Sequence, residues 1–249
     1  MKLIINADDF GLSKSITDGI VEGIKGNYIT STSIMVNMEY TEYAIKKAIE
    51  NNIKCIGLHA NLTLGKPIIK NENITDEDGY FLYNKFQIEN DKLTYDDAYN
   101  EIKAQIVKLK ELSNNKIRID HLDTHHYLCK NSNIRKAIID IANELNVPIR
   151  KENEQITAKE VKCPDVFYDN FSIYNIKIEE LEKLISNYRN KDIIVEMVTH
   201  PGYIDEYTKQ ITSCLTRDEE LKVLKRAKLQ GIFEQVDLID FSKNKIGEI

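Results

Sequence analysis

Residues 2–13, KLIINADDFGLS, carry the pattern that decides the fold. A short apolar run at residues 3–5 leads into the carboxylate pair Asp8 and Asp9, and a helical pattern follows. In (β/α) enzymes, strands deliver their chemical groups to one rim in this way. Three further segments repeat the design and together hold all five histidines of the chain: CIGLHANLT (55–63), IRIDHLDTHHYL (117–128) and IIVEMVTHPGY (193–203). A shared rim of metal ligands and proton carriers is therefore predicted.

The composition excludes several classes of protein. Of the 249 residues, 42% are hydrophobic and 30% are charged, which suffices for an ordinary folded core. The net charge of −6 arises from intermixed signs without a basic stripe, which argues against a nucleic-acid partner and fits a small-molecule substrate. No apolar stretch approaches the length of a membrane span, and the run after Met1 is too short for a signal peptide. We therefore expect a cytoplasmic protein without membrane contact; a homodimer is only an assumption.

Short apolar runs alternate with helical patterns along the whole chain. A polar stretch between about residues 66 and 92 interrupts the alternation and predicts an inserted loop or lid. The repeating series predicts an α/β fold with a parallel sheet, and at this length a barrel or distorted barrel. No Gly/Ser/Pro-rich linker divides the chain, so residues 1–249 are expected to form one domain. Strands are predicted at 2–6, 30–36, 53–58, 117–122, 147–150, 192–198 and 236–241, and helices at 15–25, 41–51, 94–113, 133–145, 178–188 and 217–228.

The segment HLDTHH, residues 121–126, allows two geometries. On a helix, His121 and His125 would share one face as in HExxH metallopeptidases, but the partner glutamate is missing and the preceding IRID is β-like. In an extended chain, His121, Asp123 and His125 share one face at period two. Extended geometry is the better interpretation, with Asp123 placed to back a ligand histidine.

Each candidate residue also has a simpler explanation when it is considered alone. His59 in a strand is more often a buried side chain than a ligand. The Asp8 and Asp9 pair could be a turn followed by a helix cap, and His200 could belong to a turn with a packed imidazole. Four such segments, all at the C-terminal ends of predicted strands, make these explanations hard to sustain together. The residue types favour a metal site of one aspartate and two or three histidines.

The segments NADDFGLS, GLHANLT, HLDTHH and THPG resemble, in this order, the signature of the YdjC-like carbohydrate deacetylases, a family that includes chitooligosaccharide deacetylases. The segments TSTSIMVN, GKP and PDVF extend the similarity over almost the whole chain. The resemblance implies a distorted, TIM-barrel-like (β/α) barrel related to polysaccharide deacetylases. It also implies one divalent metal ion, magnesium or zinc, and removal of an N-acetyl group from an acetylated mono- or oligosaccharide.

The resemblance also implies roles for individual residues. It makes Asp9, His59 and His125 the metal ligands and Asp8 the general base. His200, on another strand, is the candidate acid. The remaining candidates would orient these groups or contact substrate: His121, Asp123, Arg150 and Asp165. Arg150 could pair with either of the first two aspartates.

Two departures from the family pattern concern the substrate. Tyr127 stands where the family often has a further histidine, and the chain contains no tryptophan on which a sugar could stack. Aromatic residues of the insertion are the candidate substitutes: Tyr80, Phe81, Tyr83 and Phe86.

Three other functions use similar residues. Fe(II) oxygenases share a two-histidine, one-carboxylate face, but they favour an all-β fold. A metal-dependent phosphoesterase would usually need more carboxylates, a second metal and basic groups for phosphate. A non-catalytic saccharide- or metal-binding protein would not require both Asp8 and His200. Release of acetate separates the deacetylase from all three.

Overall fold

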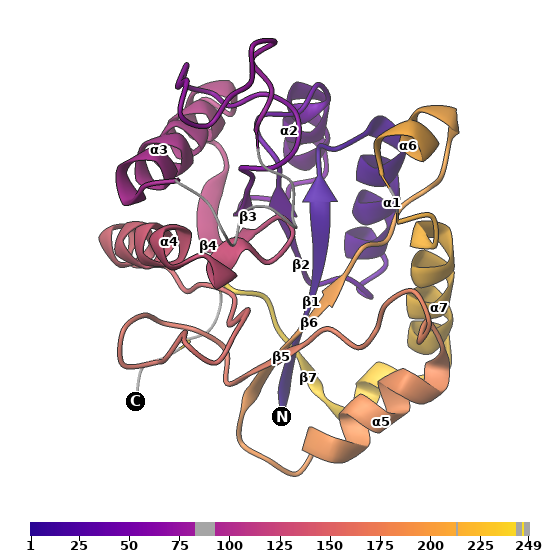
Figure 1. Cartoon of the computed structure of the whole chain (residues 1–249). Helices are drawn as coiled ribbons and strands as arrows, with labels where there is room; N and C mark the ends of the chain where they lie inside the picture. The colour runs from indigo at the N-terminus through magenta and orange to yellow at the C-terminus, as the bar shows by residue number, and fades with distance from the viewer. Residues whose placement is uncertain (83–92, 213, 243–245, 247–249) are drawn as a thin grey trace.

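A parallel sheet at the centre of the molecule joins strands from both ends of the chain (Figure 1). The computed structural model describes residues 1–82, 93–212, 214–242 and 246. In these residues the strands are β1 (Lys2–Phe10), β2 (Ser31–Ile34), β3 (Cys55–Ala60), β4 (Arg118–Thr124), β5 (Val166–Tyr168), β6 (Ile194–Thr199) and β7 (Asp237–Leu238). Their order is β4-β3-β2-β1-β6-β5, and β7 pairs with the start of β1. Every pairing between these strands is parallel, so their C-terminal ends share one rim.

The helices cover the outside of this sheet (Figure 1). They are α1 (Lys14–Lys25), α2 (Thr41–Glu50), α3 (Tyr95–Leu112), α4 (Ser132–Leu145), α5 (Ile178–Tyr188), α6 (Glu206–Ile211) and α7 (Arg217–Leu229). Helix α3 packs beside α4, and α1 packs against both α2 and α7. Ile16 and Ile20, from the apolar stripe of α1, are fully buried by this packing. Within the described part of the chain, every helix is too short or too polar to cross a membrane.

The barrel closes through irregular backbone between β4 and β5. At the β4 edge, Leu122 forms a parallel bridge with Ile149, whose amide donates to the carbonyl of Lys162 at 2.8 Å. Lys162 lies shortly before β5, the opposite edge of the sheet. The predicted distorted (β/α) barrel is thus confirmed. The strand predicted at 147–150 is wrong beyond this one bridge, since Pro148 has no amide hydrogen for a longer ladder.

All six helices that the sequence predicts are present, as α1 to α5 and α7. Strand β5 and helix α6 are not predicted, because three and six residues are too few to show a period. The last predicted strand, 236–241, shortens to the two residues of β7.

The predicted insertion after β3 is anchored on α3. The Glu101 carboxylate accepts hydrogen bonds from the amides of Ile68, at 2.9 and 3.1 Å, and Ile69, at 3.1 Å. Thr75 and Phe81 form an antiparallel bridge farther along. The described part of the insertion, up to residue 82, lies at the rim side of the barrel, at the top of Figure 1.

The inward-facing side chains become polar toward the rim. Along β1 these residues are Ile4, Asn6 and Asp8, at the period of two that a strand imposes. Ile4 packs with Phe241 and Ile246, whereas Asn6 Nδ2 donates to Asp8 Oδ1 at 2.9 Å. The barrel is therefore apolar at the base and polar at the end where the strands finish.

Candidate metal centre

A bulge in β1 brings Asp8 and Asp9 to the same rim. The register between β1 and β2 shifts between Ala7 and Phe10, and Asp9 has a φ of +69°. Neighbours in a regular strand point to opposite faces, whereas a bulge re-aims one side chain. Aspartate is among the few non-glycine residues that tolerate this left-handed conformation. Two adjacent carboxylates therefore reach one site.

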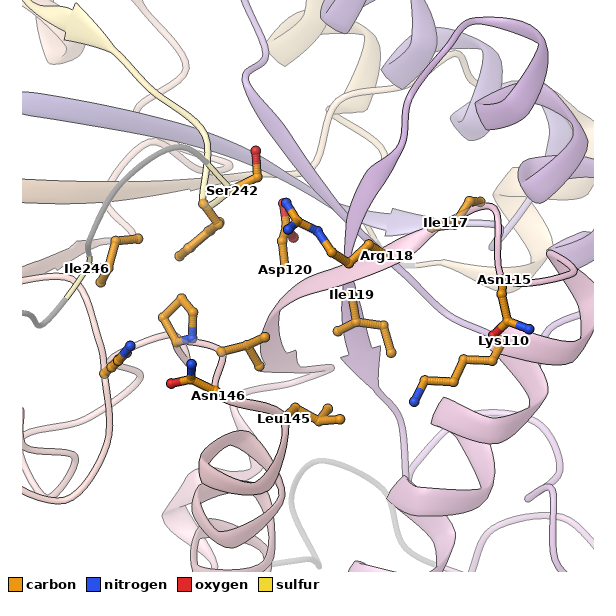
Figure 2. Close-up of a pocket in the computed structure, with 14 residues that line it drawn as sticks. Lys110, Asn115, Ile117, Arg118, Ile119, Asp120, Leu145, Asn146, Ser242 and Ile246 are labelled. Carbon is orange, nitrogen blue, oxygen red and sulfur yellow. The ribbon is translucent and has the colours of Figure 1, made fainter.

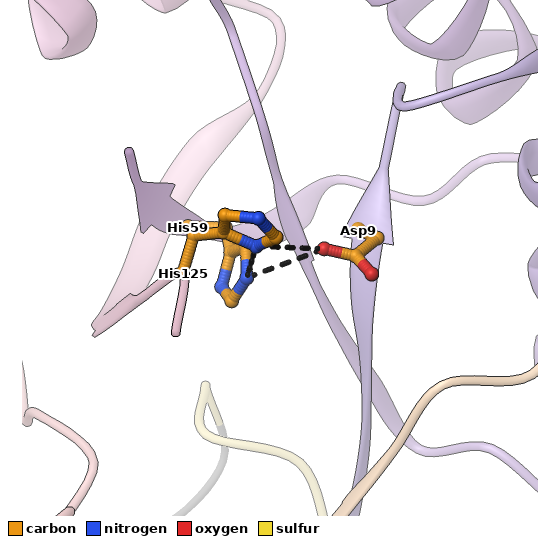
Figure 3. Close-up of side chains that lie close together, drawn as sticks. All are labelled: Asp9, His59 and His125. Carbon is orange, nitrogen blue, oxygen red and sulfur yellow. Dashed lines mark hydrogen bonds and ion pairs between the residues drawn. The ribbon is translucent and has the colours of Figure 1, made fainter. Parts of the chain in front are cut away.

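Asp9, His59 and His125 face one another at the rim (Figure 3). Asp9 Oδ1 lies 3.4 Å from His59 Nε2 and 3.2 Å from His125 Nδ1, and these two nitrogens are 3.3 Å apart. Ligands held at about 2.1 Å from a tetrahedral zinc ion lie about 3.4 Å from one another. Asp9 Oδ1 is buried and accepts no hydrogen bond from the described residues. The three atoms could therefore hold one metal ion.

His59 on β3 is oriented by Asp123 on β4. Asp123 Oδ1 lies 2.8 Å from His59 Nδ1, and Asp123 Oδ2 accepts a hydrogen bond from Ser33 Oγ at 2.8 Å. A proton on His59 Nδ1 leaves the lone pair of Nε2 free for a metal. The contact expected between Asp123 and a candidate ligand histidine is confirmed.

The first four residues of the HLDTHH segment, 121–124, are extended, as predicted. His121 and Asp123 are buried neighbours within β4, with His121 Nε2 3.8 Å from Asp123 Oδ2. His125 follows the end of the strand. The next residues, His126 and Tyr127, have φ values of +69° and +55°. These left-handed residues turn the chain sharply away, so only the first histidine of the pair joins the triangle.

Arg150 fixes Asp8 from below the rim. Its Nη1 and Nη2 donate to the two oxygens of Asp8 at 2.8 and 2.7 Å, and Nη2 also lies 3.0 Å from Asp123 Oδ2. Asp8 Oδ2 lies 3.8 Å from His59 Nε2 and 3.9 Å from His200 Nε2. The sequence left open whether Arg150 binds Asp8 or Asp9, and in the structure it binds Asp8. A planar guanidinium that holds both oxygens sets the orientation of the carboxylate.

His200 follows β6 and is held from α7. Its amide donates to Glu220 Oε2 at 2.6 Å. Its side chain is 25% exposed, so the ring reaches the opening of the site. Burial lowers the pKa of His200, although the charges of Asp8 and Asp9 act in the opposite direction. A neutral imidazole beside Asp8 is poised to exchange a proton with it.

Buried negative charge exceeds buried positive charge at the site. Among the described residues, Asp8, Asp9 and Asp123 are paired with two buried arginines, Arg150 and Arg217. Burial raises the pKa of Asp9, but Arg217 and the two histidines outweigh it and hold that pKa well below its usual range. An uncompensated buried charge is strongly unfavourable. A divalent cation would offset it.

The pKa shifts of neighbouring groups agree with this charge balance. Burial lowers the pKa of His59, yet the charges of Asp123 and Asp8 outweigh burial and raise it well above its usual value. Burial raises the pKa of Glu196 to about 7 and that of Glu220 to about 8, so at neutral pH Glu220 is mostly protonated and Glu196 carries only part of a negative charge. The negative surroundings that raise the pKa of His59 would also favour a bound metal ion. Such an ion would take the place of the proton on His59.

Two predicted residues lie away from the opening. Asp165 precedes β5, and its Oδ2 accepts a hydrogen bond from the amide of Ile194, the first residue of β6, at 2.8 Å. This is the end of the sheet opposite the rim, so Asp165, expected as a substrate contact, lies away from the metal triangle. His121 lies deeper in the barrel, with Nδ1 2.7 Å from Asp120 Oδ1 and its ring stacked on Phe241 at 3.8 Å. It supports the site from beneath.

The aromatic residues expected to stack on a sugar differ in their exposure to solvent. Phe81 is buried in the core, whereas Tyr80 is half exposed and lies under Lys66 Nζ, 4.6 Å from the ring centre. Tyr83 and Phe86 lie outside the described residues. Of this set, Tyr80 is the one that the described structure leaves open to a ligand.

Arg217 and Glu220, both buried on α7, were not predicted as site residues. The sequence TRDE at 216–219 has the pattern of a capping box, but Thr216 makes no side-chain cap bond. Instead, Arg217 reaches Asp9 Oδ2 at 2.5 Å. Both residues belong to the buried stripe of α7. Charged residues at stripe positions of an amphipathic helix are the sequence signal that would have revealed them.

A separate cavity of about 810 Å³ lies at the other end of the barrel (Figure 2). Its lining includes Arg118 and Ile119 at the start of β4, Leu145 at the end of α4, and Phe241. It shares no residue with the triangle at the rim. The candidate site is therefore identified by the metal-ligand atoms of the triangle and not by the size of a cavity.

The loop that carries His200 packs directly against α1. A Cβ added to Gly202 would lie 2.9 Å from the Cα of Ile16. We expect Gly202→Ala to lower the free energy of unfolding by about 1–3 kcal/mol, because backbone must move to make room. Denaturant unfolding measures this change. A loss below about 0.5 kcal/mol would show that helix and loop separate easily.

Comparisons with known proteins identify the family and the fold. A family model described as YdjC-like protein matches residues 2–235. A carbohydrate deacetylase of Clostridium beijerinckii is 35% identical over 250 residues, covering 97% of this chain and 99% of that protein. A crystal structure from Enterococcus faecalis V583, of a protein provisionally described as acting in cellobiose-phosphate cleavage, matches with a TM-score of 0.86 and 28% identity over 96% of this chain and 97% of that one. Peptidoglycan deacetylase PdaC of Bacillus subtilis shares the fold alone, with a TM-score of 0.51 and 9% identity over 95% of this chain and 86% of that one.

Proposed function

The chain belongs to the YdjC-like family, as its motifs suggested, and from this premise we propose that it is a metal-dependent carbohydrate deacetylase. Its reaction is the hydrolysis of an N-acetyl group on a mono- or oligosaccharide of the chitooligosaccharide kind. The observation that carries the proposal is the triangle of Asp9, His59 and His125, whose donor atoms lie 3.2 to 3.4 Å apart. The name of the Clostridium relative supports the substrate class.

Asp9, His59 and His125 would hold one divalent ion, and imidazole ligands favour zinc over magnesium. When bound, such an ion supplies Lewis acidity toward water and the acetyl carbonyl. Three protein ligands would leave such an ion able to bind a water or a substrate oxygen as well. The bulge in β1 and the Asp123 contact hold two of the ligands before a metal arrives.

Asp8 and His200 divide the proton transfers. Asp8 Oδ2 takes the proton of the attacking water, which is the work of a general base. The departing amine needs a proton, and His200 Nε2 delivers it. The two atoms are 3.9 Å apart, so one water or a small shift passes the proton between them. Arg150 keeps Asp8 oriented throughout, and His121 and Asp123 support the site from the barrel interior.

Phosphoester hydrolysis fits the same residues less well. A phosphate group needs positive side chains that are free to bind it. Arg150 is held by Asp8 and Arg217 by Asp9, both at short distances. Neither guanidinium is available to a phosphate without breaking a buried ion pair.

Removal of the metal tests the proposal. We expect purified protein to release acetate from short N-acetylated chitooligosaccharides, to lose this activity on dialysis against a chelator, and to regain it with added zinc. The reason is that Lewis acidity at the carbonyl has no substitute among the side chains. Acetate is measured by a coupled enzymatic assay. Release that survives complete demetallation would contradict metal dependence, and no release from the metal-loaded protein would contradict the substrate class.

A further inference from the structure

Arg217 is a fully buried arginine that contacts a candidate metal ligand from the helix layer. It is the first residue of α7, and its Nη2 donates to Asp9 Oδ2 at 2.5 Å. The other oxygen of Asp9 faces His59 and His125. The carboxylate is therefore divided, with one oxygen held by the arginine and one turned to the metal triangle.

The guanidinium of Arg217 is itself fixed in place. Its Nη2 also lies 3.3 Å from Thr212 Oγ1, and its Nη1 lies 3.5 Å from the carbonyl of His200. The carbonyl of Arg217 accepts a hydrogen bond from the Gly202 amide at 3.2 Å. The first turn of α7 is thus tied both to the end of β1, through Asp9, and to the loop after β6.

Packing alone does not account for an arginine here. The other stripe positions of α7 include Leu221 and Leu224, and an apolar residue at position 217 would extend that stripe. A buried guanidinium needs partners for all its donors, yet Arg217 Nε has none in the described residues. A side chain that is unfavourable for packing and aimed at a ligand carboxylate indicates a role at the site.

We infer that Arg217 is a positioning residue that holds Asp9 as a one-oxygen metal ligand. By occupying Oδ2, it prevents the carboxylate from rotating or binding the metal through both oxygens. The inference rests on the metal site of the proposed function and extends it to a residue on a helix outside the barrel. Partners that orient a metal ligand typically change metal affinity by about 10- to 100-fold when they are removed.

The test is zinc binding to the metal-free protein, measured by calorimetric titration. Arg217→Met is expected to weaken binding by about 10- to 100-fold. Arg226→Met is the matched control, because it makes the same change at an exposed position of the same helix and should bind as wild type. Arg217→Lys keeps the charge but shortens the reach, so it should also bind more weakly. Equal affinity of Arg217→Lys and wild type would overturn positioning in favour of charge alone.

A double-mutant cycle separates positioning from a general loss of structure. If Arg217 acts through Asp9, then Arg217→Met should cause little further loss of zinc affinity in an Asp9→Asn background, titrated at the higher zinc concentrations that this weakened site needs. Fully additive losses would overturn the inference, as would wild-type affinity in Arg217→Met. Near-ultraviolet circular dichroism identifies a variant that has not folded. If Arg217→Met has not folded, the zinc affinity of Arg217→Lys decides between positioning and charge alone. Because no step measures acetate, the inference can hold even if the substrate class is wrong; absence of zinc binding by wild type would overturn both.

Discussion

His59→Gln is expected to weaken zinc binding by more than the roughly 100-fold that loss of a supporting partner causes, and to abolish acetate release. His59 Nε2 is one corner of the triangle, 3.4 Å from Asp9 Oδ1 and 3.3 Å from His125 Nδ1. Glutamine has similar length but offers a weakly basic amide oxygen in place of the imidazole lone pair. Two remaining ligands do not hold a zinc ion at the low concentrations at which a three-ligand site fills.

The fold should survive this change. Asp123, which loses its contact with His59, still accepts from Ser33 at 2.8 Å and lies 3.0 Å from Arg150. His126→Gln is the matched control: the exposed His126 ring bonds to Thr63 and lies 3.8 Å from the His125 ring, so this change removes a neighbouring imidazole but no donor atom of the triangle. Zinc titration and acetate release should be close to wild type in this control. Full acetate release by His59→Gln would show that the metal triangle is not the catalytic centre.

The strand-end residues could be predicted because their positions depend on local periodicity. His121 and Asp123 alternate along an extended segment, and a parallel sheet carries all strand ends to one rim. His59 and His125 therefore meet although 66 residues separate them. The same reasoning does not resolve Asp8 from Asp9, because a regular strand would point them to opposite faces.

The rest of the site depends on contacts that the sequence does not encode locally. The bulge that re-aims Asp9 is a property of strand pairing, and its partner Arg217 is 208 residues away. Asp165 belongs to the family motif PDVF. It directly precedes β5, a strand of three residues that is too short to be predicted. The direction of that strand places Asp165 at the wrong end of the barrel. The motif points to Asp165, but the position of Asp165 in the barrel follows only from the topology of the sheet.

Asp8→Asn is expected to lower kcat by about 10²- to 10⁴-fold while leaving zinc affinity within a few-fold of wild type. Asp8 lies beside the triangle without being a corner of it: its Oδ2 is 3.8 Å from His59 Nε2. Asparagine keeps the shape of the side chain and one acceptor for Arg150, but it cannot take a proton from water. Acetate-release kinetics and zinc titration on the same preparation separate the two effects.

The asymmetry between Asp8 and Asp9 makes this prediction sharp. Asp9 Oδ1 accepts no hydrogen bond from the part of the chain that the structure describes and faces two histidines, whereas both oxygens of Asp8 bind Arg150. Asp165→Asn is the matched control, because an asparagine oxygen can still accept the amide hydrogen bond at the far end of the sheet. It should retain wild-type kcat. The opposite result would be weak zinc binding by Asp8→Asn together with a kcat close to wild type at saturating zinc. In that case Asp8 would be the metal ligand and Asp9 the base. The bulge in β1 would then position the base.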